Sequence, residues 1–473
     1  MLVIKPFNVV LFLTIFIPLQ EPFFNWLPVP DSIYIWLRLV TEIIIYLLLV
    51  LVIINKMVNN KPLKKTPIDL LVIAFVGLSI FSMISKSSLT IDGINNLRSL
   101  IRYLAIYYLV VNLSISRKQF SILLLVILII GVFEGILTAG QFLSDDFNKL
   151  FLLKNVQADI GGIGTNFPKA KVGAVYGTFG SETEMALFSL IAIIIAFVFG
   201  YRKAGKIIPE PKFLIIILVI IWGIFASFKR AALLSIPILL SAVLFFSRKT
   251  RQLSLFIFVS IGLITSIVFI IFWGAWNFNF SREYQGINYR RVESFSLGDY
   301  FSNPFTTGYW EHLVESQRIR FALDVSGTML REINLIGYGP DQQNARETLA
   351  EIDPLRFVHF TRPQYGGFED VYWVAMLVYY GIIGLSIFLM ALFLLFRTSV
   401  LLTKFSDNNE IRLLGIVFNS VLVLTLIFTF VYRTFEFRAY GYNFWLLAGL
   451  VVNAYNQIIN QNHNQHELEG AII

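Results

Sequence analysis

The stretch FLIIILVIIWGIFASFKRAALLSIPILL, residues 213–240, holds two long apolar runs that are separated by one short polar turn. Only four residues lie between the runs: Ser227, Phe228, Lys229 and Arg230. Long apolar runs are typical of helices that cross the hydrocarbon core of a bilayer. The turn is too short for an ordinary loop. The stretch therefore predicts a tight pair of membrane helices whose tip carries two cations.

The composition extends this membrane character to the whole chain. Of the 473 residues, 56% are hydrophobic and only 14% are charged, whereas soluble proteins average about 25% charged residues. The net charge of +8 comes from short basic clusters between apolar runs, which is typical of topology signals and not of a nucleic-acid surface. The chain has no cysteine, so disulfides and thiolate metal sites are excluded. These features predict an all-α polytopic membrane protein whose surroundings are the lipid bilayer.

About twelve membrane spans follow from the apolar runs. They cover residues 7–20, 33–54, 67–84, 97–113, 120–142, 183–200, 213–226, 231–246, 253–275, 370–396, 412–431 and 443–459. The predicted organisation has three parts: nine membrane helices in 1–275, a large, partly helical extracytoplasmic loop in 276–370, and three further helices with a cytoplasmic tail in 371–473. A loop of that length exceeds a simple connection and predicts a functional lid or small subdomain.

The distribution of basic residues predicts the orientation of the spans. If the N terminus is cytoplasmic, the segments placed inside hold sixteen Lys and Arg, and the outer segments other than the longest hold nine. This bias fits the positive-inside rule. Both termini are then cytoplasmic, and the hairpin tip with Arg230 faces outward.

Cations on the outer side, where the rule disfavours them, predict an anionic ligand near the lipid headgroups. Arg98 and Arg102 are four residues apart and share one face of the fourth predicted span. The loop 276–370 contains nine Arg and no Lys, and the planar guanidinium can grip phosphate with two hydrogen bonds. The same loop has thirteen acidic residues, so many of these arginines are expected to pair within it. Arg38 and Glu42 are spaced for an i, i+4 pair that would neutralise both charges.

Acidic and imidazole side chains near the tenth span provide candidate bases. Glu369 and Asp370 precede that span, where they serve equally well as helix caps or as catalytic groups. His359 lies eleven residues before Asp370 and titrates near neutral pH. The chain shows no P-loop, no dinucleotide-binding fingerprint and no metal-binding constellation, so neither a metal nor a cofactor is expected.

Four motifs recur in an order that resembles the O-antigen ligase and O-antigen polymerase superfamily of bacterial surface-polysaccharide enzymes. They are GTFGSETEMALF (177–188), SFKRAALLS (227–235), LIGYGPDQQN (335–344) and EDVYWVAMLVYYGIIGLSIFL (369–389). The resemblance covers roughly residues 170–396. It implies a GT-C-like membrane glycosyltransferase that moves a glycan from an undecaprenyl-diphosphate carrier to an acceptor sugar without a metal, at the outer face of the bacterial cytoplasmic (inner) membrane.

The resemblance also implies roles for particular residues. The hairpin arginine of the family falls on Arg230, and its loop arginine falls on Arg318 or Arg320. With Arg98 and Arg102, these residues would hold the carrier diphosphate. The base that takes the proton of the acceptor is expected to be Glu369, Asp370 or His359, in that order.

The chain departs from the family at one motif. Glu369 and Asp370 stand where members of the family often have a His-Asn pair, and this departure favours a polymerase. Such a polymerase uses an undecaprenyl-diphosphate-linked oligosaccharide and an acceptor glycan, and a chain-length regulator is a further expected partner. One alternative is a ligase that attaches finished polymer to a lipid or protein acceptor. A second is a transporter of lipid-linked oligosaccharide, although no symmetry between halves supports it.

Overall fold

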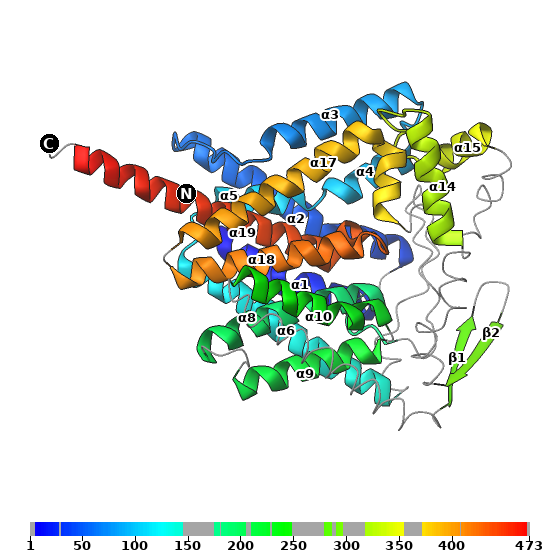
Figure 1. Cartoon of the computed structure of the whole chain (residues 1–473), viewed down its shortest axis with the longest axis horizontal. Coiled ribbons are helices and arrows are strands. Elements are labelled where there is room, and N and C mark those ends of the chain that lie inside the picture. The colour runs from blue at the N-terminus through cyan, green and yellow to red at the C-terminus, as the bar shows by residue number, and fades with distance from the viewer. Residues whose placement is uncertain are drawn as a thin grey trace.

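The computed structural model shows a bundle of long helices with a smaller group of helices and strands at one end (Figure 1). The structure describes residues 5–27, 30–144, 175–179, 181–204, 210–227, 229–247, 279–285, 290–296, 317–353, 371–406 and 408–470. Six helices in this part are long and apolar enough to cross a membrane: α1 (Pro6–Trp26), α2 (Asp31–Val58), α6 (Arg117–Leu143), α8 (Glu182–Ala204), α17 (Tyr372–Phe405) and α18 (Asn409–Phe428). Three shorter apolar helices accompany them: α3 (Asp69–Ser85), α9 (Pro211–Ala226) and α10 (Arg230–Phe246). The prediction of a multi-pass helical membrane protein is confirmed at this level.

The fourth and ninth predicted spans need separate comment. The segment predicted as 97–113 is divided into α4 (Ile91–Ile101) and α5 (Leu104–Asn112) by a turn at Arg102 and Tyr103. Arg102 is buried there, and its guanidinium is held by partners from two other elements, which the apolar pattern alone does not reveal. The predicted span 253–275 lies outside the described residues. The last span corresponds to the first part of α19 (Arg438–Gly470).

The helices differ in how much of their apolar surface the protein itself covers. Nearly every residue of α8 from Thr183 to Val198 is buried, because this helix packs against α6, α9, α10, α18 and α19. In contrast, α2 carries an apolar stripe whose members are between 46% and 59% exposed: Ile43, Leu47, Val50, Leu51 and Ile54. Such a stripe is unfavourable in water and requires hydrocarbon around it. The bundle is therefore built to lie in lipid around a central α8.

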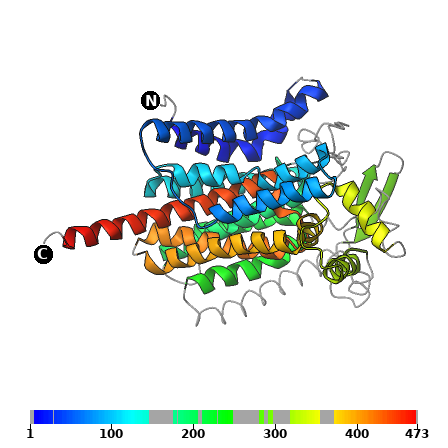
Figure 2. The same ribbon diagram turned by 90° about the horizontal axis from the view of Figure 1, so that it is seen from above.

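Contacts between distant segments sort the helix ends into two groups. At one end, Glu21 lies beside Arg438, and Asn96 donates to the carbonyl of Pro340 at 2.7 Å. At the other end, Lys56 donates to Asn112 at 2.9 Å and Gln457 to the carbonyl of Ile115 at 2.9 Å. Segments that alternate along the sequence thus meet at opposite ends of the bundle. The start of α1 and the end of α19 lie at the same end (Figures 1 and 2).

The described parts of the large loop form α14 (Gln317–Arg331), α15 (Gln342–Ile352) and an antiparallel pair of strands, β1 (Asn279–Gln285) and β2 (Arg290–Ser296). All four elements lie at the end of the bundle opposite the terminus of α19 (Figure 1). The helices agree with the prediction of a partly helical loop. The two strands form a small antiparallel pair in an otherwise helical protein, and the apolar-run analysis did not predict them.

The motif LIGYGPDQQN fastens this loop to a break in α17. At Gly381 the helix has φ 66° and ψ −170°, and this break frees backbone groups on either side. Tyr338 and Gly339 donate to the carbonyls of Val378 and Tyr379 at 2.8 and 3.0 Å. In return, Ile382 and Ile383 donate to the carbonyls of Asn334 and Leu335 at 3.2 and 3.1 Å. Gly337 and Gly339 also have positive φ, so three glycines permit the close pairing of two chain segments.

Replacing Gly381 with alanine should therefore destabilise the protein. An L-residue at this positive φ costs about 1–2 kcal/mol, and the added Cβ would collide with the carbonyl of Leu335. We expect a loss of at least that size in the free energy of unfolding, measured in detergent. Gly77→Ala in α3 is the matched control, because no atom lies within 4 Å of its added Cβ. Equal stability of the two variants would contradict the role of the glycine break.

Candidate functional site

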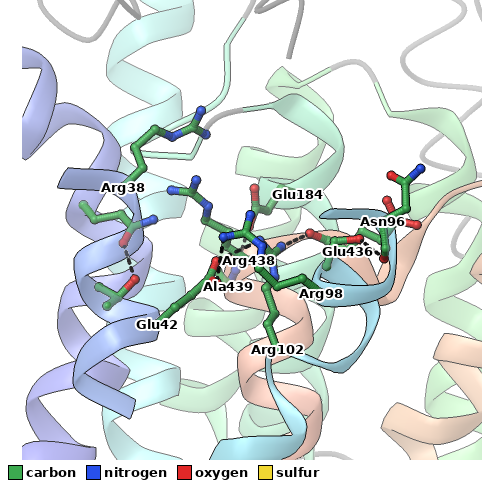
Figure 3. A network of polar contacts seen from close by, with 12 residues as sticks. Arg38, Glu42, Asn96, Arg98, Arg102, Glu184, Glu436, Arg438 and Ala439 are labelled. Atoms are coloured by element: carbon green, nitrogen blue, oxygen red, sulfur yellow. Dashed lines mark hydrogen bonds and ion pairs between the residues drawn. The ribbon is translucent and has the colours of Figure 1, made fainter. Parts of the chain in front are cut away.

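A cluster of arginines and glutamates lies at the bundle end that carries α14 and α15. Its centre is Glu42 of α2, a buried carboxylate that binds two arginines. Arg98 Nη1 lies 3.4 Å from Glu42 Oε2, and Arg102 Nη1 donates to Glu42 Oε1 at 3.3 Å. Figure 3 shows both arginines approaching this carboxylate together. The prediction that Arg98 and Arg102 share one face is confirmed by their shared partner.

The predicted intrahelical pair of Arg38 with Glu42 is wrong. Arg38 instead donates through Nε and Nη2 to Glu21 of α1, at 3.1 and 2.9 Å. Arg438 at the start of α19 donates to the same Glu21 oxygen at 2.8 Å. Arg38 faces the bundle, where a closely packed neighbouring helix supplies Glu21. This partner on another helix takes the place of Glu42, the partner four residues along α2. Glu21 and Glu42 are thus two buried carboxylates, each shared by two arginines.

Arg102 links this cluster to the turn before α19. Its Nη2 donates to the backbone carbonyl of Glu436 in the short 3-10 helix η4 (Thr434–Glu436). Its guanidinium also lies over the ring of Tyr103, 4.7 Å from the centroid. The carboxylate of Glu436 binds Arg433 at 3.2 Å. Because Arg102 is buried and has partners on two other elements, α2 and η4, its role is to hold the cluster together.

The start of α8 extends the cluster toward the hairpin tip. Ser181 Oγ accepts from the backbone N–H of Glu184 at 3.1 Å and so caps the start of α8. Glu184 accepts from the backbone N–H of Ala439 at 2.6 Å, and Glu182 lies 3.5 Å from Lys229 Nζ. Lys229 occupies the N-cap position of α10, and Arg230 begins that helix. The hairpin tip therefore lies beside the N terminus of α8.

Among the arginines of the cluster whose side chains the structure describes, Arg98 has the largest exposed fraction with which to bind a ligand. Its side chain is 29% exposed, whereas that of Arg102 is 8% exposed. The Nε–H groups of both arginines are buried and have no acceptor within the described residues. An unsatisfied charged donor costs free energy unless a partner reaches it. The geometry therefore suits an anion with several oxygen atoms that approaches from the side of Arg98.

The structure describes only part of the predicted site. Arg318 and Arg320 lie in the first turn of α14, and Arg230 begins α10, but their side chains are outside the described residues. His359, Glu369 and Asp370 lie outside the described residues altogether. The sequence analysis missed Glu21 and Glu184 as members of the cluster. An isolated acid at the end of an apolar helix is the signal that could have identified them.

Among the residues that the structure describes, no group of three or more histidine, aspartate and glutamate side chains is arranged to hold a metal ion. No protein-family model matches the chain, and no curated protein is recognisably similar to it in sequence.

The two arginines that share Glu42 should differ sharply in their effect on stability. Arg102→Ala removes the more buried of the two arginines that bind Glu42 and leaves the carbonyl of Glu436 without this donor. Loss of a partner from a buried charge typically costs about 3–5 kcal/mol. Arg98→Ala removes one end of a partly exposed pair, and we expect a loss of about 1 kcal/mol or less. Denaturant or thermal unfolding of the purified variants measures both values. Similar losses for the two variants would contradict the division into a structural and a ligand-facing arginine.

Proposed function

We propose that the protein is a polysaccharide polymerase of the bacterial cytoplasmic membrane. It transfers a glycan from an undecaprenyl-diphosphate carrier to the acceptor sugar of another lipid-linked repeat unit. The proposal includes a twelve-span, GT-C-like arrangement in which the arginine cluster faces the outer side of the membrane. It combines the order of sequence motifs with the chemistry of the cluster.

The observation that carries the proposal is the concentration of guanidinium groups around Arg98 at one end of the bundle. Arg38, Arg98, Arg102, Arg433 and Arg438 gather there with the carboxylates of Glu21, Glu42, Glu184 and Glu436. A diphosphate offers several charged oxygens, which match the fork of an arginine better than a single carboxylate does. The partly exposed Arg98 supplies the first contact, and the buried partners fix its position.

The hairpin tip supplies a second source of attraction for an anion. Lys229 and Arg230 occupy the first positions of α10, where the helix dipole already favours negative charge. Placing two cations there is unfavourable unless anions lie nearby. Glu182 provides one negative charge, at 3.5 Å from Lys229. A lipid diphosphate at the start of α10 would supply further negative charge and would lie in the headgroup region, as a lipid-linked donor requires.

In the proposed reaction, an acceptor hydroxyl attacks C1 of the donor sugar and forms the new C–O bond. The bond between C1 and the diphosphate oxygen breaks, and the leaving diphosphate takes the electron pair. Preplaced guanidinium groups stabilise the charge that grows on this leaving group. The hydroxyl proton passes to Glu369, Asp370 or His359. Asp370 is followed by Val371, and α17 begins at the next residue, Tyr372. The backbone N–H of Tyr372 donates to the carbonyl of Thr429 at 3.0 Å, next to the turn that leads to Arg433.

Polymer assembly in cells tests this function. We expect Arg98→Ala and Arg230→Ala to reduce polymer assembly by tenfold or more, because a single stabilising donor in an electrostatic site contributes on the order of 2–4 kcal/mol. The readout is the banding pattern of surface polysaccharide on a gel, at equal amounts of protein in the membrane. Arg412→Ala is the control, because this exposed arginine begins α18 at the other end of the bundle.

The banding pattern also separates the competing functions. Loss of a polymerase leaves single repeat units, loss of a ligase leaves long unattached chains, and loss of a transporter prevents repeat units from reaching the outer side. Wild-type banding in both Arg98→Ala and Arg230→Ala would overturn the proposal.

A further inference from the structure

Glu134 is a buried acid in the middle of α6 that the proposed chemistry does not use. Its side chain is fully buried, and no ion pair joins it to a cation within the described residues. Its partner is Thr178, in the turn that precedes α8. The backbone N–H of Thr178 donates to Glu134 Oε2 at 2.9 Å, and the hydroxyl of Thr178 contacts Glu134 Oε1. A charged carboxylate without a cation is very costly at such a place.

The hydroxyl of Thr178 has a second partner on α1. It lies 2.8 Å from the carbonyl oxygen of Pro18, which can only accept a hydrogen bond. In an uninterrupted helix this carbonyl would accept from the backbone N–H four residues later. That residue is Pro22, which has no N–H. The carbonyl of Pro18 therefore depends on the proton of Thr178.

A hydroxyl group has one proton to donate. Since that proton goes to Pro18, the contact between Thr178 and Glu134 requires Glu134 to be the donor. A protonated Glu134 satisfies every group in the chain of contacts: it donates from Oε1 to the hydroxyl of Thr178 and accepts from the Thr178 N–H at Oε2. It also removes the cost of a buried charge. Hydrogen-bond accounting and electrostatics thus require the same protonation state.

Neighbouring contacts show that this segment is held closely. Gln141, two turns along α6, donates to the carbonyl of Gly177 at 3.0 Å and accepts from its N–H at 2.9 Å. Gly177 has φ 61°, and a Cβ at this position would collide with the carboxyl group of Glu134. The turn therefore fits against α6 only with glycine at 177 and with the carboxyl group in this place.

We propose that the side chain of Glu134 stays protonated, as a neutral carboxylic acid, and that Glu134 serves as a positioning residue for the ionic cluster. Its hydrogen-bond chain to Thr178 and Pro18 joins α6, the turn at 177–179 and α1. That turn leads directly into Glu182 and Glu184, which bind Lys229 and the N–H of Ala439. A neutral acid can fix the turn without competing for the arginines that the proposed function uses. The inference rests on the proposed function only for its activity readout.

Infrared spectroscopy of the purified protein in lipid tests the protonation state directly. The difference spectrum between wild type and Glu134→Gln at neutral pH should contain the C=O stretching band of a carboxylic acid, with its shift in D₂O. Thr178→Val should move this band, because it removes the hydroxyl that accepts the proton. A difference spectrum that shows only carboxylate bands would overturn the proposal. This measurement needs no substrate, so its outcome is independent of the proposed function.

Matched substitutions at 134 test the positioning role. Glutamine can donate through its amide to Thr178 Oγ1 and accept from the Thr178 N–H, so Glu134→Gln should keep near-wild-type thermal stability and polymer assembly. Leucine has a similar size but leaves the N–H of Thr178 without an acceptor, so Glu134→Leu should lower the melting temperature by several degrees and reduce polymer assembly. A loss in Glu134→Gln as large as that in Glu134→Leu would overturn the proposal, because it would mean that a negative charge is required.

Discussion

The charge on Glu42 is the constraint on which the bundle end that carries α4 and η4 depends. This carboxylate lies on a largely apolar membrane helix, where an isolated charge would be very costly. Arg98 and Arg102 must reach it from another segment, and Arg102 must at the same time reach the carbonyl of Glu436. The relative positions of α2, α4, η4 and α19 follow from these contacts, and Glu21 repeats the same arrangement between α1, α2 and α19.

Two sets of hydrogen bonds that involve no cation complete this end of the molecule. The glycine break at Gly381 exchanges backbone hydrogen bonds with the segment 334–339, and the carboxyl group of Glu134 ties the turn at Thr178 to α1 and α6. Both sets fix loops without using a cation. The arginines therefore remain committed to the cluster, and Arg98 keeps part of its surface for a ligand. A rigid cationic site of this kind suits stabilisation of a leaving diphosphate, because the donors need not reorganise during the reaction.

Sequence patterns predicted those features that depend on local chemistry. The apolar runs located most of the helices, and the spacing of Arg98 and Arg102 placed these two side chains on one face. Features that depend on neighbouring helices were not predictable in this way. The i, i+4 rule assigned Arg38 to Glu42, but in the bundle Arg38 binds Glu21. Arg102, at the turn between α4 and α5, likewise binds groups on α2 and η4 that are far away in the sequence. The hydrogen bond between Thr178 and Pro18 likewise joins residues 160 positions apart.

The most direct measurement is the affinity of the purified protein for an undecaprenyl-diphosphate lipid in nanodiscs, compared between wild type and Arg98→Ala. Hydrogen bonds to charged groups contribute about 1.5–3 kcal/mol, and every 1.4 kcal/mol corresponds to a tenfold change in Kd. The account predicts that the variant binds the diphosphate lipid about tenfold or more weakly, while uncharged undecaprenol binds both proteins alike. Equal affinity of the two proteins for the diphosphate lipid would contradict the assignment of this cluster as a diphosphate site.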